Sequence, residues 1–322
     1  MKIAETASTP RRVFVAGAAH LDRRGKADGP FIPAASNPGR LTATAGGAAF
    51  NAAVALRAFG WDVAFHGARG GDSDGSRVAA AIQDAGIEDG SVTWLDRGTP
   101  SYTAILDDRG ELVAGIADMA LYDLLSPRVL SRRHIRASIA GADALLVDAN
   151  LPPPAIEALV ATAGPRPVAA IAVSPAKVRR LIGVLPALSA LVLSRAEAAS
   201  LTDAPPATDL PRLAELVAER GASRAVVTDG PREAAIVEAG SVLMQRPPTV
   251  RPRDVTGAGD TLAAAALTGL AAGLGWTDSV RRGVVAASLR ISLEHFPPAD
   301  LPQRIDDGVA ALEAPVQPER TS

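Results

Sequence analysis

One nine-residue segment of the 322-residue chain joins a glycine-rich turn to a carboxylate; it reads Arg253-Asp254-Val255-Thr256-Gly257-Ala258-Gly259-Asp260-Thr261. An alanine-rich stretch with helical spacing follows it directly. A glycine-rich turn that opens a helix directs free backbone N–H groups and the positive end of the helix dipole at one point, where an anion can bind. Gly257 and Gly259 carry no Cβ, so backbone and phosphate can approach closely. The segment predicts an anion site at the start of a helix over 256–273.

Asp260 has two interpretations. The helix dipole stabilises any carboxylate in a first helical turn, so Asp260 could serve only as an N-terminal charge or cap. It could instead be a general base that takes a proton from a hydroxyl, while the amides of Gly257 to Gly259 hold the charge of a transferring phosphoryl group. An isolated G-x-G-D pattern does not separate the two.

Two other phosphate-binding motifs are excluded by their spacing. A Walker loop requires G-x-x-x-x-G-K-[ST], and the chain has no lysine after Lys177. A dinucleotide-binding fingerprint requires G-x-G-x-x-G after the first strand, whereas these glycines lie near the C-terminus and an aspartate follows them directly.

The composition narrows the chemistry further. The formal net charge is -2, so no basic surplus indicates nucleic acid or an anionic membrane as the main partner. Without cysteine, the chain has no disulfide, thiolate nucleophile or Cys-ligated metal. Four scattered histidines lack H-E-x-x-H spacing. The N-terminus has no apolar signal-peptide core, and the longest weakly polar stretch is too short for a membrane span. We expect a cytoplasmic protein that works with carboxylates, hydroxyls, backbone amides and arginine.

Short apolar runs bounded by turn residues alternate with helical patterns, which indicates a mostly parallel sheet covered on both faces. Strands are predicted over 12–17, 62–67, 144–148, 168–173, 188–194, 224–228 and 234–237. Helices are predicted over 47–59, 76–85, 154–163, 196–201, 210–220, 256–273 and 278–293.

Two stretches break this alternation. Residues 21–45 are rich in Gly and Pro, and residues 92–117 alternate as strands around a turn at 107–110. We expect them to form a small β lid inserted into an α/β core made of 11–20, 46–91 and 118–312. The ends, 1–10 and 313–322, are expected to be disordered tails.

The motif Asp254-Val255-Thr256-Gly257-Ala258-Gly259-Asp260 resembles the D-x-T-G-A-G-D signature of the ribokinase-like (PfkB) carbohydrate and nucleoside kinases. Three further marks follow the family's order: Gly46-Gly47 with Asn51, the turn from Gly70 to Gly75, and Thr228-Asp229-Gly230. The resemblance implies a three-layer α/β/α core with a β-sheet lid, which agrees with the lid expected above.

The resemblance also implies roles for individual residues. Asp260 would be the catalytic base, and Gly257, Ala258 and Gly259 the anion hole. Asp22, Gly46, Gly47 and Asn51 would bind the substrate, while Ser194, Thr228 and Gly230 would contact the nucleotide. Glu197 would hold Mg²⁺ through water, and Asp254 and Thr256 would lie at a monovalent-cation site, for K⁺, that many members have.

Finer marks resemble the pseudouridine kinase subgroup. They are Ser36-Asn37-Pro38-Gly39 before the di-glycine, Tyr102 and Asp118 in the lid, and the run Asp148-Ala149-Asn150-Leu151. We therefore expect Tyr102, Asp118 and Asn150 near the substrate. Each mark also has a purely structural explanation. Ser36 to Gly39 could form only a turn, and Tyr102 could pack between lid and core. Asp118 could place a charge at a lid edge, and Asp148 could cap a helix.

Two residues depart from the family pattern. Ser194 stands where the N-x-x-E motif has Asn, and His20 stands where G-x-x-N-x-D has Asn. The expected activity is ATP-dependent phosphorylation of the 5′-hydroxyl of a ribosyl substrate, pseudouridine first. The alternatives are ribose, a purine nucleoside or a hexose as acceptor, or a non-catalytic ligand-binding relative. A homodimer formed through the lid is a further expectation from the resemblance.

Overall fold

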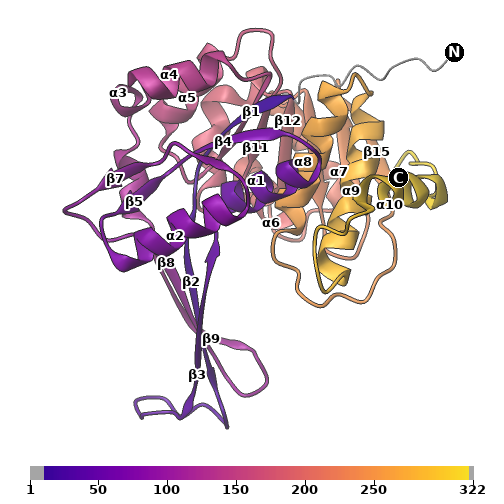
Figure 1. Cartoon of the computed structure of the whole chain (residues 1–322). Helices are drawn as coiled ribbons and strands as arrows, with labels where there is room; N and C mark the ends of the chain where they lie inside the picture. Colours follow the sequence, from indigo (N-terminus) through magenta and orange to yellow (C-terminus); the bar gives the residue numbers. More distant parts are fainter. Residues whose placement is uncertain (1–10, 319–322) are drawn as a thin grey trace, which may run out of the picture.

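A nine-stranded sheet forms the centre of the computed structural model, which describes residues 11–318 (Figure 1). The strand order is β15-β14-β13-β12-β11-β10-β1-β4-β6. All pairs are parallel except β13 with β14 and β14 with β15. The strands are β1 (Arg12–Ala16), β4 (Asp62–His66), β6 (Glu88–Asp89), β10 (Ala144–Asp148), β11 (Val168–Ile171), β12 (Ala190–Ser194), β13 (Arg224–Thr228), β14 (Ala234–Glu238) and β15 (Ser241–Gln245).

Both faces of this sheet are buried, because side chains alternate across each strand. In β1, Phe14 and Ala16 pack into one apolar cluster, whereas Val13 and Val15 pack into the other. The first face is covered by η1 (Ala120–Leu124), α3 (Pro127–Leu130), α4 (Arg133–Ala140), α5 (Pro153–Thr162), η2 (Val178–Ala187), α6 (Arg195–Thr202) and α7 (Leu210–Glu219). The second face is covered by α1 (Ala48–Ala58), α2 (Ser73–Asp84), α8 (Ala258–Ala271) and α9 (Trp276–Ser292), and α10 (Leu301–Ala311) packs outside α9.

A four-stranded sheet projects away from this core as a lid (Figure 1). Its order is β3 (Gly39–Gly46), β2 (His20–Ala27), β8 (Ser101–Leu106) and β9 (Leu112–Asp118). β2 and β8 pair in parallel and the outer pairs are antiparallel. The three-layer core with an inserted β lid is thus confirmed.

The second lid segment begins later than the sequence suggests. β7 (Val92–Trp94) does not join the lid but pairs with β5 (Ala68–Gly70) in a separate two-stranded sheet. The lid strands of this segment therefore start at Ser101.

The C-terminal tail is also shorter than expected. Val316 pairs with Met244 of β15 through two backbone hydrogen bonds of 2.7 and 3.0 Å. The side-chain amide of Gln245 donates to the carbonyl of Glu313 at 3.3 Å. Residues 313–318 are therefore ordered along the edge of the sheet, because that edge strand offers free backbone groups. Residues 1–10 and 319–322, expected to be disordered, lie outside the described residues.

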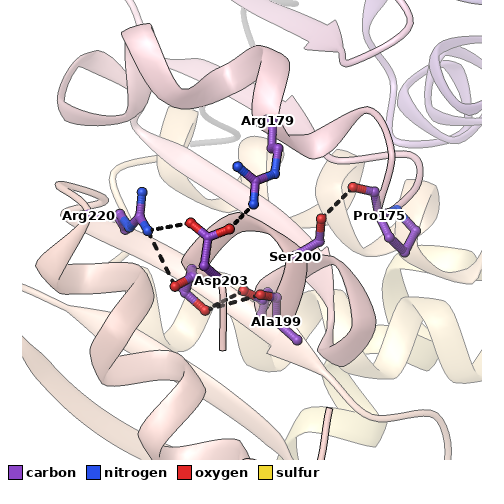
Figure 2. A network of polar contacts seen from close by, with 8 residues as sticks. Pro175, Arg179, Ala199, Ser200, Asp203 and Arg220 are labelled. Carbon is purple, nitrogen blue, oxygen red and sulfur yellow. Dashed lines mark hydrogen bonds and ion pairs between the residues drawn. The ribbon is translucent and has the colours of Figure 1, made fainter. Parts of the chain in front are cut away.

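A polar network fixes the C-terminus of α6 (Figure 2). Asp203 follows the helix in a left-handed conformation (φ 58°) and accepts hydrogen bonds from Arg179 and, at 2.8 Å, from Arg220. Ser200 donates to the carbonyl of Pro175 at 2.6 Å. These contacts connect α6 to η2 and to the end of α7, so they hold the helix whose first turn faces the predicted nucleotide site.

Among residues 11–318, no helix is long and apolar enough to cross a membrane.

Candidate active site

The glycine-rich segment forms the predicted helix start. α8 begins at Ala258, and Gly257 precedes it with a φ of 79°, a left-handed conformation that favours glycine. The turn before it is fixed because the backbone N–H of Thr256 donates to Asp254 Oδ1 at 2.9 Å. The first-turn N–H groups of Gly259 and Asp260 have no acceptor among the described residues. These free donors can bind an anion, as the sequence predicts.

Asp260 is a partly buried carboxylate in this first turn. Asn51 of α1 donates its side-chain amide to Asp260 Oδ2 at 2.9 Å. Burial raises the pKa of Asp260 to about 7, and the negative charges of Asp148 and Glu197 act in the same direction. The hydrogen bond from Asn51 and the charge of Arg290 lower the pKa but do not offset burial. A carboxylate with a pKa near neutral pH is suited to accept a proton.

The di-glycine turn lies beside Asp260 at the start of α1. Gly47 has a φ of 118°, and a Cβ there would lie 2.4 Å from the carbonyl oxygen of Ala18. A Cβ at Gly46 would lie 2.2 Å from Asp22 Oδ2. A Cβ at Gly47 would clash with backbone, whereas a Cβ at Gly46 would displace the side chain of Asp22. The turn therefore packs directly against β2 and the loop after β1. This packing places Asn51 one helical turn further on, where it contacts Asp260.

The predicted substrate residue Asp22 lies at the base of the lid. Its carboxylate contacts Gly46 and faces His20, whose Nε2 is 3.2 Å from Asp22 Oδ1. His20 Nδ1 is buried and has no hydrogen-bond partner among the described residues. The structure therefore brings Asp22, the di-glycine turn, Asn51 and Asp260 into one site.

Asp148 connects the segments of this site through hydrogen bonds. The fully buried carboxylate at the end of β10 accepts the backbone N–H of Ala18 at 3.0 Å and that of Ala49 at 3.1 Å. It also accepts both the backbone N–H and the side-chain amide of Asn150, each at 2.9 Å. One side chain thus fixes the loop after β1 and the first turn of α1.

Asn150 is buried in the same network. It is 2% exposed, and its side-chain oxygen accepts a hydrogen bond from Lys177 Nζ. Lys177 is half-buried, and burial lowers its pKa. Asn150 is therefore close to the di-glycine turn, but its side-chain amide and oxygen are already bonded to Asp148 and Lys177.

The two lid residues lie on opposite faces of the lid. Tyr102 pairs in register with Asp22, so both side chains lie on one face. Asp118 pairs with Ser101, the residue before Tyr102, and so lies on the other face. The Tyr102 hydroxyl would be 2.7 Å from a Cβ at Gly115, so its ring lies across β9. The structure groups Tyr102 with Asp22 and separates Asp118 from both.

A pocket of about 130 Å³ opens on the other side of the anion site. It is lined by Thr228 and Gly230, which are predicted to contact the nucleotide, and by Ala258 and Gly259. The remaining wall is mostly apolar and comes from α8, α9 and the strands nearby; it consists of Asp229, Arg232, Ala234, Pro247, Leu262, Val284, Ala287, Ser288 and Ile291. An apolar pocket that ends at a helix N-terminus suits an aromatic base joined to phosphates.

Ser194 and Glu197 form a capping box at the start of α6. Glu197 N–H donates to Ser194 Oγ at 3.3 Å, and Ser194 N–H donates to Glu197 Oε2 at 2.6 Å. The other carboxylate oxygen of Glu197 receives no hydrogen bond from the described residues, so it fits the outer shell of a hydrated Mg²⁺. Among residues 11–318 no group of three or more His, Cys, Asp and Glu gathers as a metal site. Mg²⁺ bound mainly through nucleotide phosphates requires no such group.

Sequence reasoning missed the roles of Asp148 and Lys177. Asp148 looks like a strand-end cap in the sequence, because the backbone groups that it binds lie 99 and 130 positions away. Lys177 could have been singled out from the sequence, because it is one of only three lysines in a chain whose other basic residues are arginine.

Comparisons with known proteins identify the family of the chain. The family description "pfkB family carbohydrate kinase" matches residues 10–295. Pseudouridine kinase of Escherichia coli is 26% identical over 295 residues, which cover 90% of this chain and 93% of that protein. A carbohydrate kinase structure from Agrobacterium tumefaciens is 38% identical with a TM-score of 0.83, covering 95% of this chain and 99% of that one. Arabidopsis thaliana ribokinase, solved with ribose and ATP, shares the fold with a TM-score of 0.77 at 19% identity, over 94% of this chain and 99% of that one.

The chain belongs to the pfkB family of carbohydrate kinases. Kinases of this family use ATP and transfer its phosphoryl group to a hydroxyl acceptor. Within that class the protein is a sugar or nucleoside kinase.

Proposed function

We propose that this kinase phosphorylates the 5′-hydroxyl of a ribosyl substrate, with pseudouridine as the preferred acceptor and Asp260 as the general base. The observation that supports the reaction most strongly is the environment of Asp260. A carboxylate with a pKa raised to about 7 lies in the first turn of α8, next to backbone N–H groups that have no protein acceptor. A proton acceptor and an anion site are therefore adjacent.

Phosphoryl transfer depends mainly on positioning and on charge stabilisation. Asp22 and Asn51 would orient the acceptor hydroxyls, and Asp260 would accept the proton of the attacking hydroxyl. The N–H groups of Gly257 and Gly259 would stabilise the charge that develops on the phosphoryl oxygens, whereas the N–H of Ala258 already donates to the carbonyl of Val255 at 3.4 Å. Thr228 and Gly230 would lie against the nucleotide.

Two further elements complete the site. When bound, Mg²⁺ neutralises phosphate charge, and the free carboxylate oxygen of Glu197 would hold it through water. The lid would close over the acceptor and exclude water, which protects ATP from hydrolysis. Its contact with the core is consistent with closure, since Arg24 Nη2 lies 3.4 Å from Thr256 Oγ1.

The likeness to E. coli pseudouridine kinase over 90% of the chain supports pseudouridine as the acceptor. The position of Tyr102 supports it as well, because its ring shares a lid face with Asp22 and could stack on a base attached to the ribose that Asp22 binds.

A panel of acceptors tests the substrate. Purified protein with ATP and Mg²⁺ is assayed for ADP release with pseudouridine, uridine, ribose, adenosine and fructose, and the phosphorylated product is identified by mass spectrometry. Uridine is the sharpest competitor, because it differs from pseudouridine only in the bond between ribose and base. We expect kcat/KM for pseudouridine to exceed that for every other acceptor at least ~10-fold, which is about 1.4 kcal/mol of discrimination. An equal or greater value for another acceptor would refute pseudouridine as the substrate.

We also propose that the protein forms a homodimer through its lid. The face of the lid opposite Tyr102 carries Leu41 and Ile116, which are 84% and 71% exposed. Large apolar side chains gathered on an exposed sheet indicate a protein interface. A second copy of the chain would bury this face.

A further inference from the structure

Arg24 of β2 is a lid residue that reaches the anion-hole turn, residues 254–259. Its Nη2 lies 3.4 Å from Oγ1 of Thr256, which directly precedes Gly257. The two residues are 232 positions apart in the sequence, so it is the contact between lid and core that brings them together. Arg24 therefore lies beside the turn whose free N–H groups form the anion site.

The side chain of Arg24 lies on the lid face that carries the predicted substrate residues. Side chains alternate across a strand, so Arg24 shares a face with Asp22, two residues earlier on β2. Tyr102 pairs in register with Asp22 and lies on the same face. Arg23 lies on the other face, where it pairs with Asp74 in the first turn of α2. One strand face thus presents both a carboxylate for the acceptor and a guanidinium group.

The guanidinium group of Arg24 has an unpaired charge and free donors. Among residues 11–318 it forms no ion pair with a carboxylate, whereas the adjacent Arg23 does. The hydrogen bond of its side chain goes to the hydroxyl of Thr256, a neutral acceptor. A guanidinium group has five N–H donors in a planar fork that matches two oxygens of a phosphate. Most of the donors of Arg24 are therefore available to a phosphoryl group at the turn.

Two further cations share this face of the lid but not this contact. Lys26 follows Arg24 by two residues on β2 and pairs with Arg40 of β3. All three line one open cavity of the lid. Within the part of the chain that the structure describes, the side chains of Lys26 and Arg40 form no hydrogen bond or ion pair, whereas that of Arg24 contacts Thr256. Arg24 is thus the cation of this face that reaches the anion site.

We propose that Arg24 is a catalytic residue supplied by the lid, whose guanidinium group binds the phosphoryl group while it passes from ATP to the acceptor. The acceptor oxygen forms the new bond to phosphorus and gives its proton to Asp260, and the bond to ADP breaks with its electron pair on ADP. Arg24 exchanges no proton. It stabilises the charge on the phosphoryl oxygens from the lid side, while the free N–H groups of the turn do so from the core side. This inference rests on the proposed function and adds a residue to it.

Three variants test the proposal. Arg24→Gln removes the charge and the fork, Arg24→Lys keeps the charge without the fork, and Lys26→Gln removes the neighbouring cation of the same strand face. The values of kcat and KM are measured with ATP, Mg²⁺ and the best acceptor of the panel.

We expect Arg24→Gln to lose at least ~10²-fold in kcat, Arg24→Lys to lose less, and Lys26→Gln to stay within ~3-fold of wild type. The KM for the acceptor should change less than ~3-fold in all three, because Arg24 acts on the phosphoryl group and not on the acceptor. A kcat of Arg24→Gln within ~3-fold of wild type would overturn the proposal, and so would an equal loss in Lys26→Gln.

A binding measurement separates this role from that of a mere tether between lid and core. ADP is titrated by calorimetry into each protein saturated with acceptor and Mg²⁺, with and without aluminium fluoride, which imitates the phosphoryl group in transfer. Aluminium fluoride should raise the affinity for ADP in wild type and in Lys26→Gln. Arg24→Gln should lose at least ~10-fold of this gain, although its Kd for ADP alone is unchanged. An equal gain in Arg24→Gln and wild type would overturn the proposal.

The two proposals fail in different ways. A wild-type protein that phosphorylates no acceptor would refute the proposed function. An active wild-type protein and an equally active Arg24→Gln would refute only the role of Arg24.

Discussion

Asp260 lies in the first turn of a helix and is also buried. The sequence shows the first property but not the second. In that turn the helix dipole favours the charged form, yet burial dominates and raises the pKa of Asp260 to about 7. A simple helix charge at the surface would have a lowered pKa. The environment therefore favours the general base over the plain N-terminal charge, the two interpretations that the G-x-G-D pattern leaves open.

The activity should consequently depend on pH. The native carboxyl keeps its proton up to about pH 7, whereas an ordinary aspartate loses it near 3.8. Only the ionised form can accept a proton, so kcat/KM should fall about tenfold per pH unit below pH 7 and level off above about pH 8. The profile is measured from pH 5.5 to 9 with ATP saturating. Full activity retained at pH 5.5 would contradict this prediction.

The same pKa has the opposite consequence for folding. Between pH 3.8 and about 7 the native state holds a proton that the unfolded chain has lost, so this group makes the protein less stable as pH rises through that window. Asp260→Asn lacks the effect. We expect it to unfold at an equal or higher temperature than wild type at pH 8. A clearly lower temperature would refute the burial account.

Asp148 should matter for stability as well as for activity. Asp148→Ala would leave the N–H groups of Ala18 and Ala49 and the side chain of Asn150 without their acceptor. Unsatisfied buried donors cost ~1 to 3 kcal/mol each, so we expect a loss of about 3 kcal/mol or more in the free energy of unfolding. Urea denaturation measures the loss, and exposed Asp108→Ala is the control. A loss below about 1 kcal/mol would show that Asp148 does not hold these segments.

The di-glycine turn is the element that joins lid and core. Gly47 lies so close to the loop after β1 that a Cβ would meet its backbone, and Gly46 lies against the Asp22 side chain of β2. We expect Gly47→Ala to lower kcat/KM at least ~10²-fold, because a Cβ 2.4 Å from the carbonyl of Ala18 would move α1 and, with it, Asn51. Gly29→Ala, where a Cβ meets nothing within 4 Å, is the matched control and should keep its activity. Equal activity of both variants would show that the turn does not position the site.

The elements of the core could be predicted because each depends on local patterns. The run at 144–148 predicts β10 with its observed bounds, since a buried parallel strand is apolar throughout. The sequence does not predict the edge strand β15, because exposed and buried residues do not alternate regularly along it. Its pairing with Val316 also depends on a segment that lies far along the chain. The residues of the site also differ in whether their positions depend on local sequence. The helix start at Gly257 is local and predictable, whereas the positions of Asp148, Lys177 and Arg290 arise only when remote segments pack together.

At the scale of the whole molecule, the lid extends from the core (Figure 1). Its face opposite Tyr102 carries the exposed side chains of Leu41 and Ile116. If two copies cover each other's lids, charge placed on this face should separate them. We expect the wild-type protein to sediment as a dimer of about 66 kDa, twice the 32.9 kDa of one chain, and Leu41→Lys with Ile116→Lys as a monomer. Leu95→Lys, an equally exposed leucine outside the lid sheet, is the control. A wild-type monomer at micromolar concentration would refute the lid dimer.

The whole account depends on Asp260 as the base of a phosphoryl transfer. The most direct test is the turnover number of Asp260→Asn, which keeps the shape of the side chain and its contact with Asn51 but cannot accept the proton. With pseudouridine or the best acceptor of the panel, we predict that kcat falls ~10² to 10⁴-fold while the Kd for ATP, measured by calorimetry, changes less than ~3-fold. A variant that retains the wild-type kcat would contradict the account.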